Sequence, residues 1–247
     1  MATGTLTPWE GGGGHTITQA FYDTNNQLKK LILENHFDLS QFADSGALEN
    51  VDQLTWRHYI VYWSSVFALK NTQSARINYV ECGVCDGLTT YFALSAAKTL
   101  NKPFKAYLYD AWDSWKEDSL LKSDQSIARD YAFLNMEATK RNLNLFGTDV
   151  ITFNRGYIPD VFQVANNPET LIWLHIDLNS AKPTIHALKY FWDKLEDGGV
   201  VLFDDYAWSG HQETKKAVED WSADRNGTLF HLPTGQALVI KNRTKEL

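Results

Sequence analysis

The fold of this chain is decided by the stretch Glu81-Cys82-Gly83-Val84-Cys85-Asp86-Gly87, which follows a short β-rich run at residues 77–81. A helical pattern begins at residue 89, so the two glycines lie in a turn between a strand and a helix. Glycine lets the backbone bend sharply and lets a ligand approach the main chain. Because open α/β sheets bind ligands beyond the carboxyl ends of their strands, this turn predicts a site for a nucleotide-like ligand.

Short β-rich runs and helical runs alternate downstream of residue 75. The predicted strands are 77–81, 104–109, 150–154, 171–176 and 199–203, and the predicted helices are 89–100, 126–145, 184–195 and 213–222. This alternation predicts an α/β fold, with a parallel sheet covered by helices on both faces. Two further β-rich runs, 228–232 and 237–241, are joined by Pro233-Thr234-Gly235. That turn is typical of a hairpin, so the last strand should run antiparallel to the others.

The first 75 residues have a different character. Two helices are predicted, at 18–35 and 53–69, and the second is dense in aromatic residues. We therefore expect residues 1–75 to form a flexible segment and a helical cap, and residues 76–247 to form one ligand-binding domain. The four glycines at 11–14 are interpreted as part of a mobile terminus, in preference to a lid over the ligand.

Composition narrows the class of protein. The 247 residues carry a net charge of −7 with no basic stripe, which argues against a nucleic-acid partner. No run of eighteen apolar residues occurs and no basic segment precedes an apolar one, so neither a membrane span nor a secretory signal is expected. The two cysteines, three positions apart, cannot cross-link a fold of this size, which favours the cytoplasm.

Asp110 ends the second predicted strand, 23 residues after Gly87, where a carboxylate can accept hydrogen bonds from ribose hydroxyls. The third glycine of the dinucleotide fingerprint is missing. Glu81 would repel a pyrophosphate but would attract the ammonium group of an amino acid, directly or through water. A ligand with a ribose and an amino acid but no phosphate fits best, and S-adenosylmethionine (SAM) is such a ligand.

Cys82 and Cys85 invite a redox interpretation, but Glu81 precedes them, and an acidic neighbour raises the pKa of a thiol. A zinc site would need a second pair of ligands of this kind. We interpret both cysteines as small residues that fill a tight turn.

Asp177 ends one predicted strand, and Asp204 and Asp205 end another. The carboxyl ends of parallel strands meet at one edge, so these carboxylates should converge and repel one another unless a cation lies between them. Oxygen ligands suit Mg²⁺ or another hard divalent ion. The alternative is that one aspartate caps a helix while another faces water.

Five motifs in a particular order carry a family resemblance. They are Val80-Glu81-Cys82-Gly83-Val84, Tyr109-Asp110-Ala111-Trp112, Arg155-Gly156-Tyr157-Ile158-Pro159-Asp160, His175-Ile176-Asp177-Leu178-Asn179 and Leu195-Glu196-Asp197-Gly198-Gly199-Val200-Val201-Leu202-Phe203-Asp204-Asp205-Tyr206. With them, residues 77–241 resemble the macrocin O-methyltransferase-like family of class I SAM-dependent methyltransferases, which act on sugars of polyketides and other natural products.

The resemblance implies a doubly wound, Rossmann-like sheet of seven strands with a reversed last strand. It implies a divalent ion on Asp177, Asp204 and Asp205. It also implies that Glu81, Gly83 and Asp110 bind SAM. We expect further SAM contacts from the neighbouring motif and turn residues Val84, Gly87, Ala111, Trp112, Gly156, Tyr157 and Asp177. The family's Asp-Gly-Asp-Leu-Tyr segment is here Asp177-Leu178-Asn179-Ser180, a departure that concerns the surroundings of the metal and the acceptor pocket.

Methyl transfer to oxygen needs a base that removes the hydroxyl proton. His211 is the first candidate, with a surface histidine or helix-cap residue as the alternative for it, and Lys182 is the second. Asp177 is a further candidate catalytic residue through the metal. His175 lies inside a strand and is interpreted as structural. The aromatic cap and residues 112–125 are expected to wall a pocket for a small-molecule acceptor, a sugar, glycoside or phenol, and an exposed cap would suit a homodimer.

Two other classes remain open. One is an NAD-dependent oxidoreductase on a Rossmann-like fold, which the missing glycine and Glu81 disfavour. The other is a non-catalytic module that binds SAM, which the three aspartates disfavour.

Overall fold

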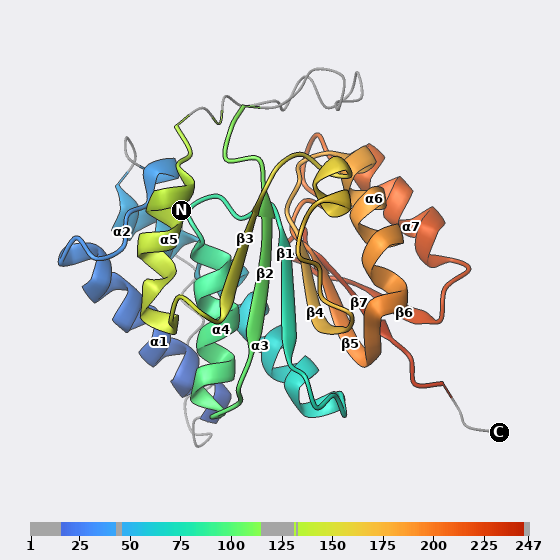
Figure 1. Ribbon diagram of the computed structural model, residues 1–247, viewed down its shortest axis with the longest axis horizontal. Helices are drawn as coiled ribbons and strands as arrows, with labels where there is room; N and C mark the ends of the chain where they lie inside the picture. The colour runs from blue at the N-terminus through green and yellow to red at the C-terminus, as the bar shows by residue number, and fades with distance from the viewer. Residues whose placement is uncertain (1–15, 43–45, 115–130, 132, 245–247) are drawn as a thin grey trace.

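Seven strands form one sheet through the middle of the molecule (Figure 1). The computed structural model describes residues 16–42, 46–114, 131 and 133–244. The strands are β1 (Asn78–Cys82), β2 (Lys105–Asp110), β3 (Ile151–Arg155), β4 (Leu171–Ile176), β5 (Leu195–Phe203), β6 (Gly227–His231) and β7 (Ala237–Lys241). The α-helices in the described ranges are α1 (Thr16–Leu33), α2 (Ala47–Gln53), α3 (Thr55–Asn71), α4 (Leu88–Thr99), α5 (Met136–Leu143), α6 (Ala181–Phe191) and α7 (Gln212–Ser222).

The strands lie in the order β3-β2-β1-β4-β5-β7-β6. The first five run parallel, whereas β7 is antiparallel to both β5 and β6. The α/β fold with a reversed last strand is therefore confirmed. The order turns back between β1 and β4, so the loops after these two strands leave toward opposite faces and open a crevice at their carboxyl ends.

Helices cover both faces of the sheet. In Figure 1, α1, α3, α4 and α5 lie on one side, and α6 and α7 lie on the other. Neighbouring strand residues supply the two cores alternately, because side chains in a strand point to opposite faces. Thus Tyr79 and Trp173 pack with the first group of helices, and Val80 and Leu174 pack with the second.

Each predicted element that the structure describes is present; β4 and β7 have the predicted bounds, and the bounds of the others differ. The helix predicted at 126–145 is shorter, because Asn135 caps α5 by accepting a hydrogen bond from the backbone N–H of Glu137 at 2.9 Å. Residues 126–130 and 132 lie outside the described ranges. The strand predicted at 199–203 begins four residues earlier, and the short helix α2 was not predicted.

The helical cap joins the main core rather than standing apart. Phe21 of α1 and Tyr62 of α3 belong to the same buried cluster as Phe92 of α4. The division of the chain at residue 75 stays a prediction. Residues 11–14 and 115–125, predicted as a mobile terminus and part of the pocket wall, lie outside the described ranges. Across those ranges, no helix combines the length and hydropathy needed to cross a membrane.

Candidate functional site

Gly83 lies where the loops after β1 and β4 touch. Its φ is +85°, and a Cβ atom there would stand 1.9 Å from the main-chain oxygen of Asp177. The backbone N–H of Asp177 donates to the oxygen of Cys82 at 2.9 Å, which locks the same contact. Only glycine satisfies both the positive φ and the close approach. The close approach is to the chain after β4, and the approach of a ligand to Gly83 stays a prediction.

Asp110 holds the turn after β1 in shape. Its Oδ2 accepts hydrogen bonds from the backbone N–H groups of Val84 (2.6 Å) and Cys85 (2.9 Å), and its Oδ1 accepts one from Trp112 (2.7 Å). Burial raises the pKa of Asp110, and the three N–H donors oppose that rise. A carboxylate oxygen has two lone-pair sites, so Oδ1 retains capacity for a further donor such as a ribose hydroxyl.

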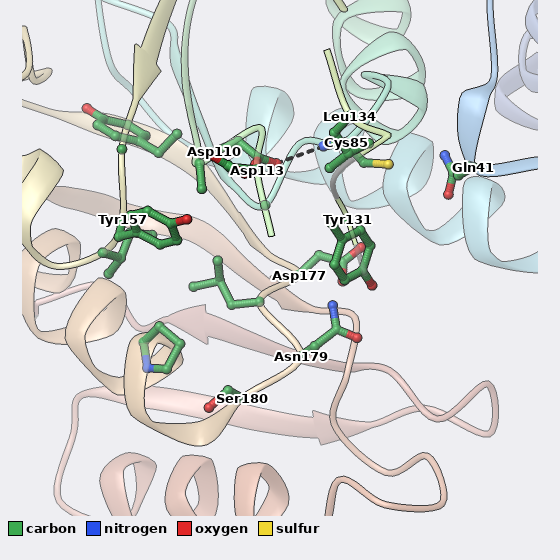
Figure 2. Close-up of a pocket in the computed structure, with 17 residues that line it drawn as sticks. Gln41, Cys85, Asp110, Asp113, Tyr131, Leu134, Tyr157, Asp177, Asn179 and Ser180 are labelled. Atoms are coloured by element: carbon green, nitrogen blue, oxygen red, sulfur yellow. Dashed lines mark hydrogen bonds between the residues drawn. The ribbon is translucent and has the colours of Figure 1, made fainter. Parts of the chain in front are cut away.

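A cavity, partly open to solvent, lies at the carboxyl ends of β1, β2, β3 and β4 (Figure 2). Figure 2 shows Asp110, Tyr157, Asp177 and Asn179 around the same space. Six of the predicted cofactor residues line it: Gly83, Asp110, Ala111, Gly156, Tyr157 and Asp177. The cavity therefore brings together most of the site that the sequence predicts.

Other predicted cofactor residues support the turn instead of lining the cavity. Gly87, with a φ of +84°, precedes α4, and a Cβ there would lie 3.0 Å from the Leu143 side chain. The buried Trp112 donates its indole N–H to Thr139 at 2.9 Å and to the oxygen of Cys85 at 3.2 Å. Val84 contributes its N–H to Asp110. Direct contact of these three residues with a cofactor stays a prediction.

Glu81 is buried behind the turn and does not line the cavity. Its carboxylate accepts hydrogen bonds from the hydroxyls of Thr89 and Thr90, and it lies 2.8 Å from Nδ1 of His175. Burial lowers the pKa of His175, but Asp204 and Glu81 outweigh it and raise the pKa to about 10. Glu81 thus has a cationic partner inside the protein, and its predicted attraction for a ligand ammonium group stays a prediction.

Several residues of the cavity were not predicted, because they come from segments that are distant in the sequence from the glycine turn. Gln41 lies in a short 3-10 helix (Ser40–Phe42), and Tyr131 and Leu134 precede α5. Asp86 ties that 3-10 helix to the turn, since its carboxylate accepts from the Ser40 hydroxyl and the Gln41 N–H, both at 3.0 Å. A polar residue such as Asp86 inside a glycine turn indicates a hydrogen-bonded contact, but the sequence does not show which segment it contacts.

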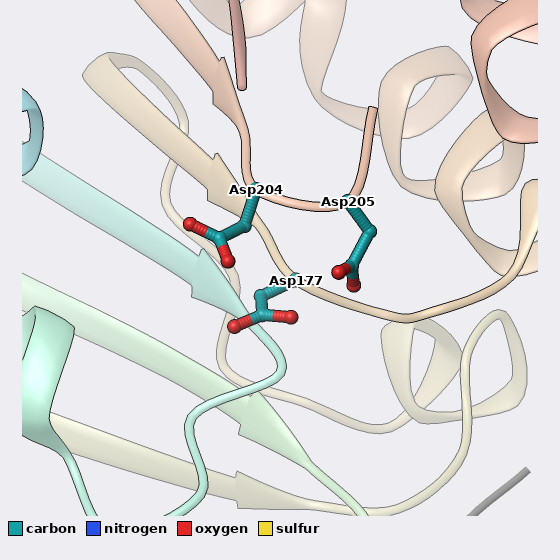
Figure 3. Close-up of side chains that lie close together, drawn as sticks. All are labelled: Asp177, Asp204 and Asp205. Carbon is teal, nitrogen blue, oxygen red and sulfur yellow. The ribbon is translucent and has the colours of Figure 1, made fainter. Parts of the chain in front are cut away.

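The predicted convergence of Asp177, Asp204 and Asp205, hereafter the acidic cluster, is observed (Figure 3). One carboxylate oxygen from each residue lies within 4.8 Å of the others. Burial and mutual repulsion raise the pKa of Asp177 and Asp205. Burial acts in the same direction on Asp204, but Arg57 and His175 hold its pKa well below the usual range.

Arg57 of α3 reaches into this cluster and was not predicted. Its Nε donates to both oxygens of Asp204, at 2.9 and 2.8 Å, and its Nη2 donates to Oδ2 of Asp177 at 2.5 Å. The buried Gln236 also donates to Asp204, at 2.8 Å. Arg57 and Asp204 are 147 residues apart in the chain, so no local pattern could pair them.

The acidic cluster fits a divalent cation by the chemistry of its donors. Three carboxylates at close range are the hard oxygen ligands that Mg²⁺ and related ions prefer. Burial and then repulsion between the carboxylates raise the pKa of Asp177 and Asp205, and a cation between them would relieve that repulsion. An ion there would share Asp177 and Asp204 with the guanidinium of Arg57.

The two candidate bases lie in different surroundings. His211 is largely buried directly before α7, with its Nε2 3.7 Å from Oδ1 of Asp205. Lys182 is exposed in the first turn of α6 and does not line the cavity, although Ser180 and Pro183 beside it do. The geometry favours His211, because it adjoins the acidic cluster.

The two cysteines are not bonded to each other. Burial raises the pKa of both thiols, and nearby carboxylates raise it further. Both thiols are therefore protonated at neutral pH. This agrees with their interpretation as filling residues of the turn.

Comparisons with known proteins agree with this geometry. A family model described as a methyltransferase domain matches residues 80–206, just over half of the chain. No curated protein matches the chain at a significant level.

Solved structures show the fold. The O-methyltransferase NovP is 19% identical, with a TM-score of 0.64 over 76% of this chain and 80% of its own. CalS11, a calicheamicin methyltransferase, is 18% identical, with a TM-score of 0.59 over 94% and 98%. Its apo structure, described as a TDP-rhamnose 3'-O-methyltransferase, gives 0.52 at 16% identity over 93% and 96%. The SAH-bound methyltransferase PaMTH1 of Podospora anserina is 10% identical, with a TM-score of 0.53 over 97% and 100%.

Proposed function

The chain belongs to the family of methyltransferase domains, and from this premise we propose that it transfers the methyl group of SAM to a hydroxyl of a small molecule. The observation that carries the proposal is the position of Asp177. This residue lines the cavity that Asp110 borders, and it also belongs to the acidic cluster. A cofactor in the cavity and an acceptor oxygen at the cluster would therefore be neighbours, as an in-line displacement requires.

SAM is the proposed cofactor. The cavity offers Asp110 for the ribose hydroxyls, and Gly83 and Gly156 also line it. Tyr157 donates its hydroxyl to the oxygen of Ser114 at 2.6 Å, which holds its ring at the cavity wall. The family membership supports the same cofactor.

The proposed acceptor is a sugar, a glycoside or a phenol. Its hydroxyl would lie at the acidic cluster. His211, whose Nε2 lies 3.7 Å from Oδ1 of Asp205, is the proposed base that takes the proton, and Lys182 is the second candidate. CalS11, with which this chain shares a fold, is described as acting on TDP-rhamnose, a sugar nucleotide. Transfer to oxygen within the macrocin O-methyltransferase-like group remains part of the proposal.

A divalent cation is the second proposed cofactor, with Asp177, Asp204 and Asp205 as its ligands. Such an ion would supply a Lewis acid that orients an acceptor hydroxyl and lowers the pKa of that hydroxyl. The carboxylates themselves hold the charge that attracts the ion, and Asn179 restrains Asp205 by donating its backbone N–H at 3.0 Å.

Titration calorimetry with SAM, S-adenosylhomocysteine (SAH) and NAD tests the cofactor, and transfer of labelled methyl to a panel of glycosides and phenols tests the activity. We expect binding of SAM and SAH, no binding of NAD, and methyl transfer to at least one hydroxyl. Binding of NAD without SAM would favour the oxidoreductase alternative. Binding of SAM without transfer to any acceptor would favour the non-catalytic module.

Three further expectations stay predictions. They are the cytoplasmic location, the absence of a nucleic-acid partner and a homodimer through the cap. The mass of the protein in solution would test the homodimer directly.

A further inference from the structure

Arg57 is a buried cation at the proposed metal site. Its side chain is 14% exposed, and it comes from α3, outside the segment that the family model matches. Its guanidinium bridges two residues of the acidic cluster, Asp177 and Asp204. An arginine in this position supplies positive charge to the same oxygens that a divalent ion would need.

The contacts use the shape of the guanidinium. Nε serves both oxygens of Asp204, while Nη2 reaches across to Asp177, so one planar group spans two carboxylates. Charge-assisted hydrogen bonds of this kind are stronger than neutral ones, and the planar fork loses little entropy when it forms them. Burial would lower the pKa of Arg57, but Asp204 and Asp177 raise it further above its normal value. The guanidinium is therefore a permanent charge.

Asp204 is surrounded by nitrogen groups on its other sides. Gln236 donates to Oδ1, and Nε2 of His175 lies 3.8 Å from the same oxygen. That Nε2 is fully buried and makes no hydrogen bond with any residue in the described ranges. The buried imidazole of His175 therefore occupies this side of Asp204. Arg57 donates to both Asp204 and Asp177, so its guanidinium occupies the space next to the oxygens that these two residues would offer to an ion.

The start of α3 is also fixed against the loop that carries the cluster. Trp56 packs on Trp208, with 5.5 Å between ring centroids, and Trp208 lies between Asp205 and α7. The packing of Trp56 and the hydrogen bonds of Arg57 therefore both hold Arg57 beside the cluster. Its withdrawal from the carboxylates has an energetic cost that a metal ion must overcome.

We propose that Arg57 and a divalent cation compete for Asp177 and Asp204, so that the guanidinium leaves the acidic cluster when an ion binds to all three carboxylates. The proposal deepens the proposed function, because it rests on the metal role of these aspartates. Through Arg57, the helical cap would then help to set the affinity for the metal. In the metal-free protein, Arg57 would hold the acidic cluster together.

Binding of Mn²⁺, followed by electron paramagnetic resonance and calorimetry, tests the competition. The variant Arg57→Met keeps much of the side-chain volume and removes the charge, so we expect Mn²⁺ to bind at least tenfold more tightly, about 1.4 kcal/mol. Arg57→Lys keeps a charge without the fork, and it should tighten binding by less. Arg76→Met is the matched control, since it removes an exposed arginine that pairs with Glu169, and it should leave Mn²⁺ affinity unchanged.

Unchanged or weaker Mn²⁺ binding by Arg57→Met, with a native melting curve, would show that the two cations do not compete. If that variant fails to fold, hydrogen exchange in the wild-type protein tests the competition instead. The Arg57 Nε–H should be protected from exchange with solvent without metal and lose protection when Mg²⁺ saturates the site. Protection that persists with Mg²⁺ bound would overturn the proposal.

SAH binding by the same preparations separates this inference from the proposed function. A protein that fails to bind SAH but shows the tenfold change in Mn²⁺ affinity would contradict the cofactor assignment and support the competition. A protein that binds SAH but shows no change in Mn²⁺ affinity on Arg57→Met would support the cofactor assignment and contradict the competition.

Discussion

Glu81 and His175 form a buried ion pair across neighbouring strands, with the carboxylate 2.8 Å from Nδ1 of the imidazole. They are directly opposite in the register of β1 and β4. Nε2 of the same imidazole faces Asp204 at 3.8 Å. Glu81, His175 and Asp204 thus form a row of alternating charges that links the glycine turn to the acidic cluster.

Replacement of Glu81 by alanine tests the weight of this pair. The change removes the nearest partner of His175 inside the core and the acceptor of the Thr89 and Thr90 hydroxyls, so we expect a loss of about 3–5 kcal/mol in the free energy of unfolding. Chemical denaturation measures it. Glu169→Ala breaks the exposed pair with Arg76 and should have no measurable effect, because such pairs contribute little. Equal stability of the two variants would contradict the assigned role of Glu81.

Gly83→Ala should destabilise the protein and weaken SAH binding together. The new Cβ would meet the oxygen of Asp177 at 1.9 Å, so the loops after β1 and β4 must separate. We expect a cost of about 2–4 kcal/mol from overpacking plus the positive φ. Gly147→Ala is the control, since its φ is +101° but its nearest contact is the movable side chain of Asp149. Thermal melts should show a clearly smaller loss for the control.

Asp110→Ala removes the acceptor for three backbone N–H groups of the turn. We expect SAH affinity to fall by at least tenfold, about 1.4 kcal/mol, because both the turn and the proposed ribose contact are lost. Calorimetry gives the dissociation constant. Asp160→Ala, an exposed aspartate that does not line the cavity, is the control. Undiminished SAH binding by Asp110→Ala would exclude Asp110 from the cofactor site.

Removal of the divalent ion should abolish methyl transfer but leave cofactor binding nearly unchanged. Excess chelator, or the double variant Asp204→Ala with Asp205→Ala, is expected to abolish methyl transfer while SAH affinity changes by less than about threefold. The reason is position, since neither Asp204 nor Asp205 lines the cavity. Methyl transfer that survives both treatments would contradict the metal role.

The thiols should react slowly at neutral pH. Burial raises the pKa of Cys82 and Cys85, and the thiolate is the reactive form. Alkylation by iodoacetamide, followed by mass spectrometry of the native protein, should therefore be slow at pH 7.5. It should rise by up to tenfold for each unit of increasing pH below the pKa. SAH should slow modification of Cys85 further, because Cys85 lines the cavity. Rapid alkylation at pH 7 would contradict the raised pKa values.

The sequence was sufficient to predict those parts of the site that follow from local pattern. Asp110, Asp177 and Asp204 each stand at or just beyond the end of an apolar strand, and parallel strands bring such ends to one edge. The same argument placed Glu81 at that edge, yet its side chain points inward to His175. Alternation along a strand tells which residues share a face, but the partner of each side chain depends on the neighbouring strand.

Pattern alone determined the α/β fold, the reversed last strand and the glycine turn, because periodicity and turn chemistry act over a few residues. Only the tertiary structure decided that Glu81 pairs with His175, that Asp86 recruits the segment containing Gln41, and that Arg57 enters the acidic cluster. These contacts join residues 45 to 147 positions apart. They form because a buried charge needs an opposite charge or hydrogen-bond donors beside it, and the packed fold determines which groups are within reach.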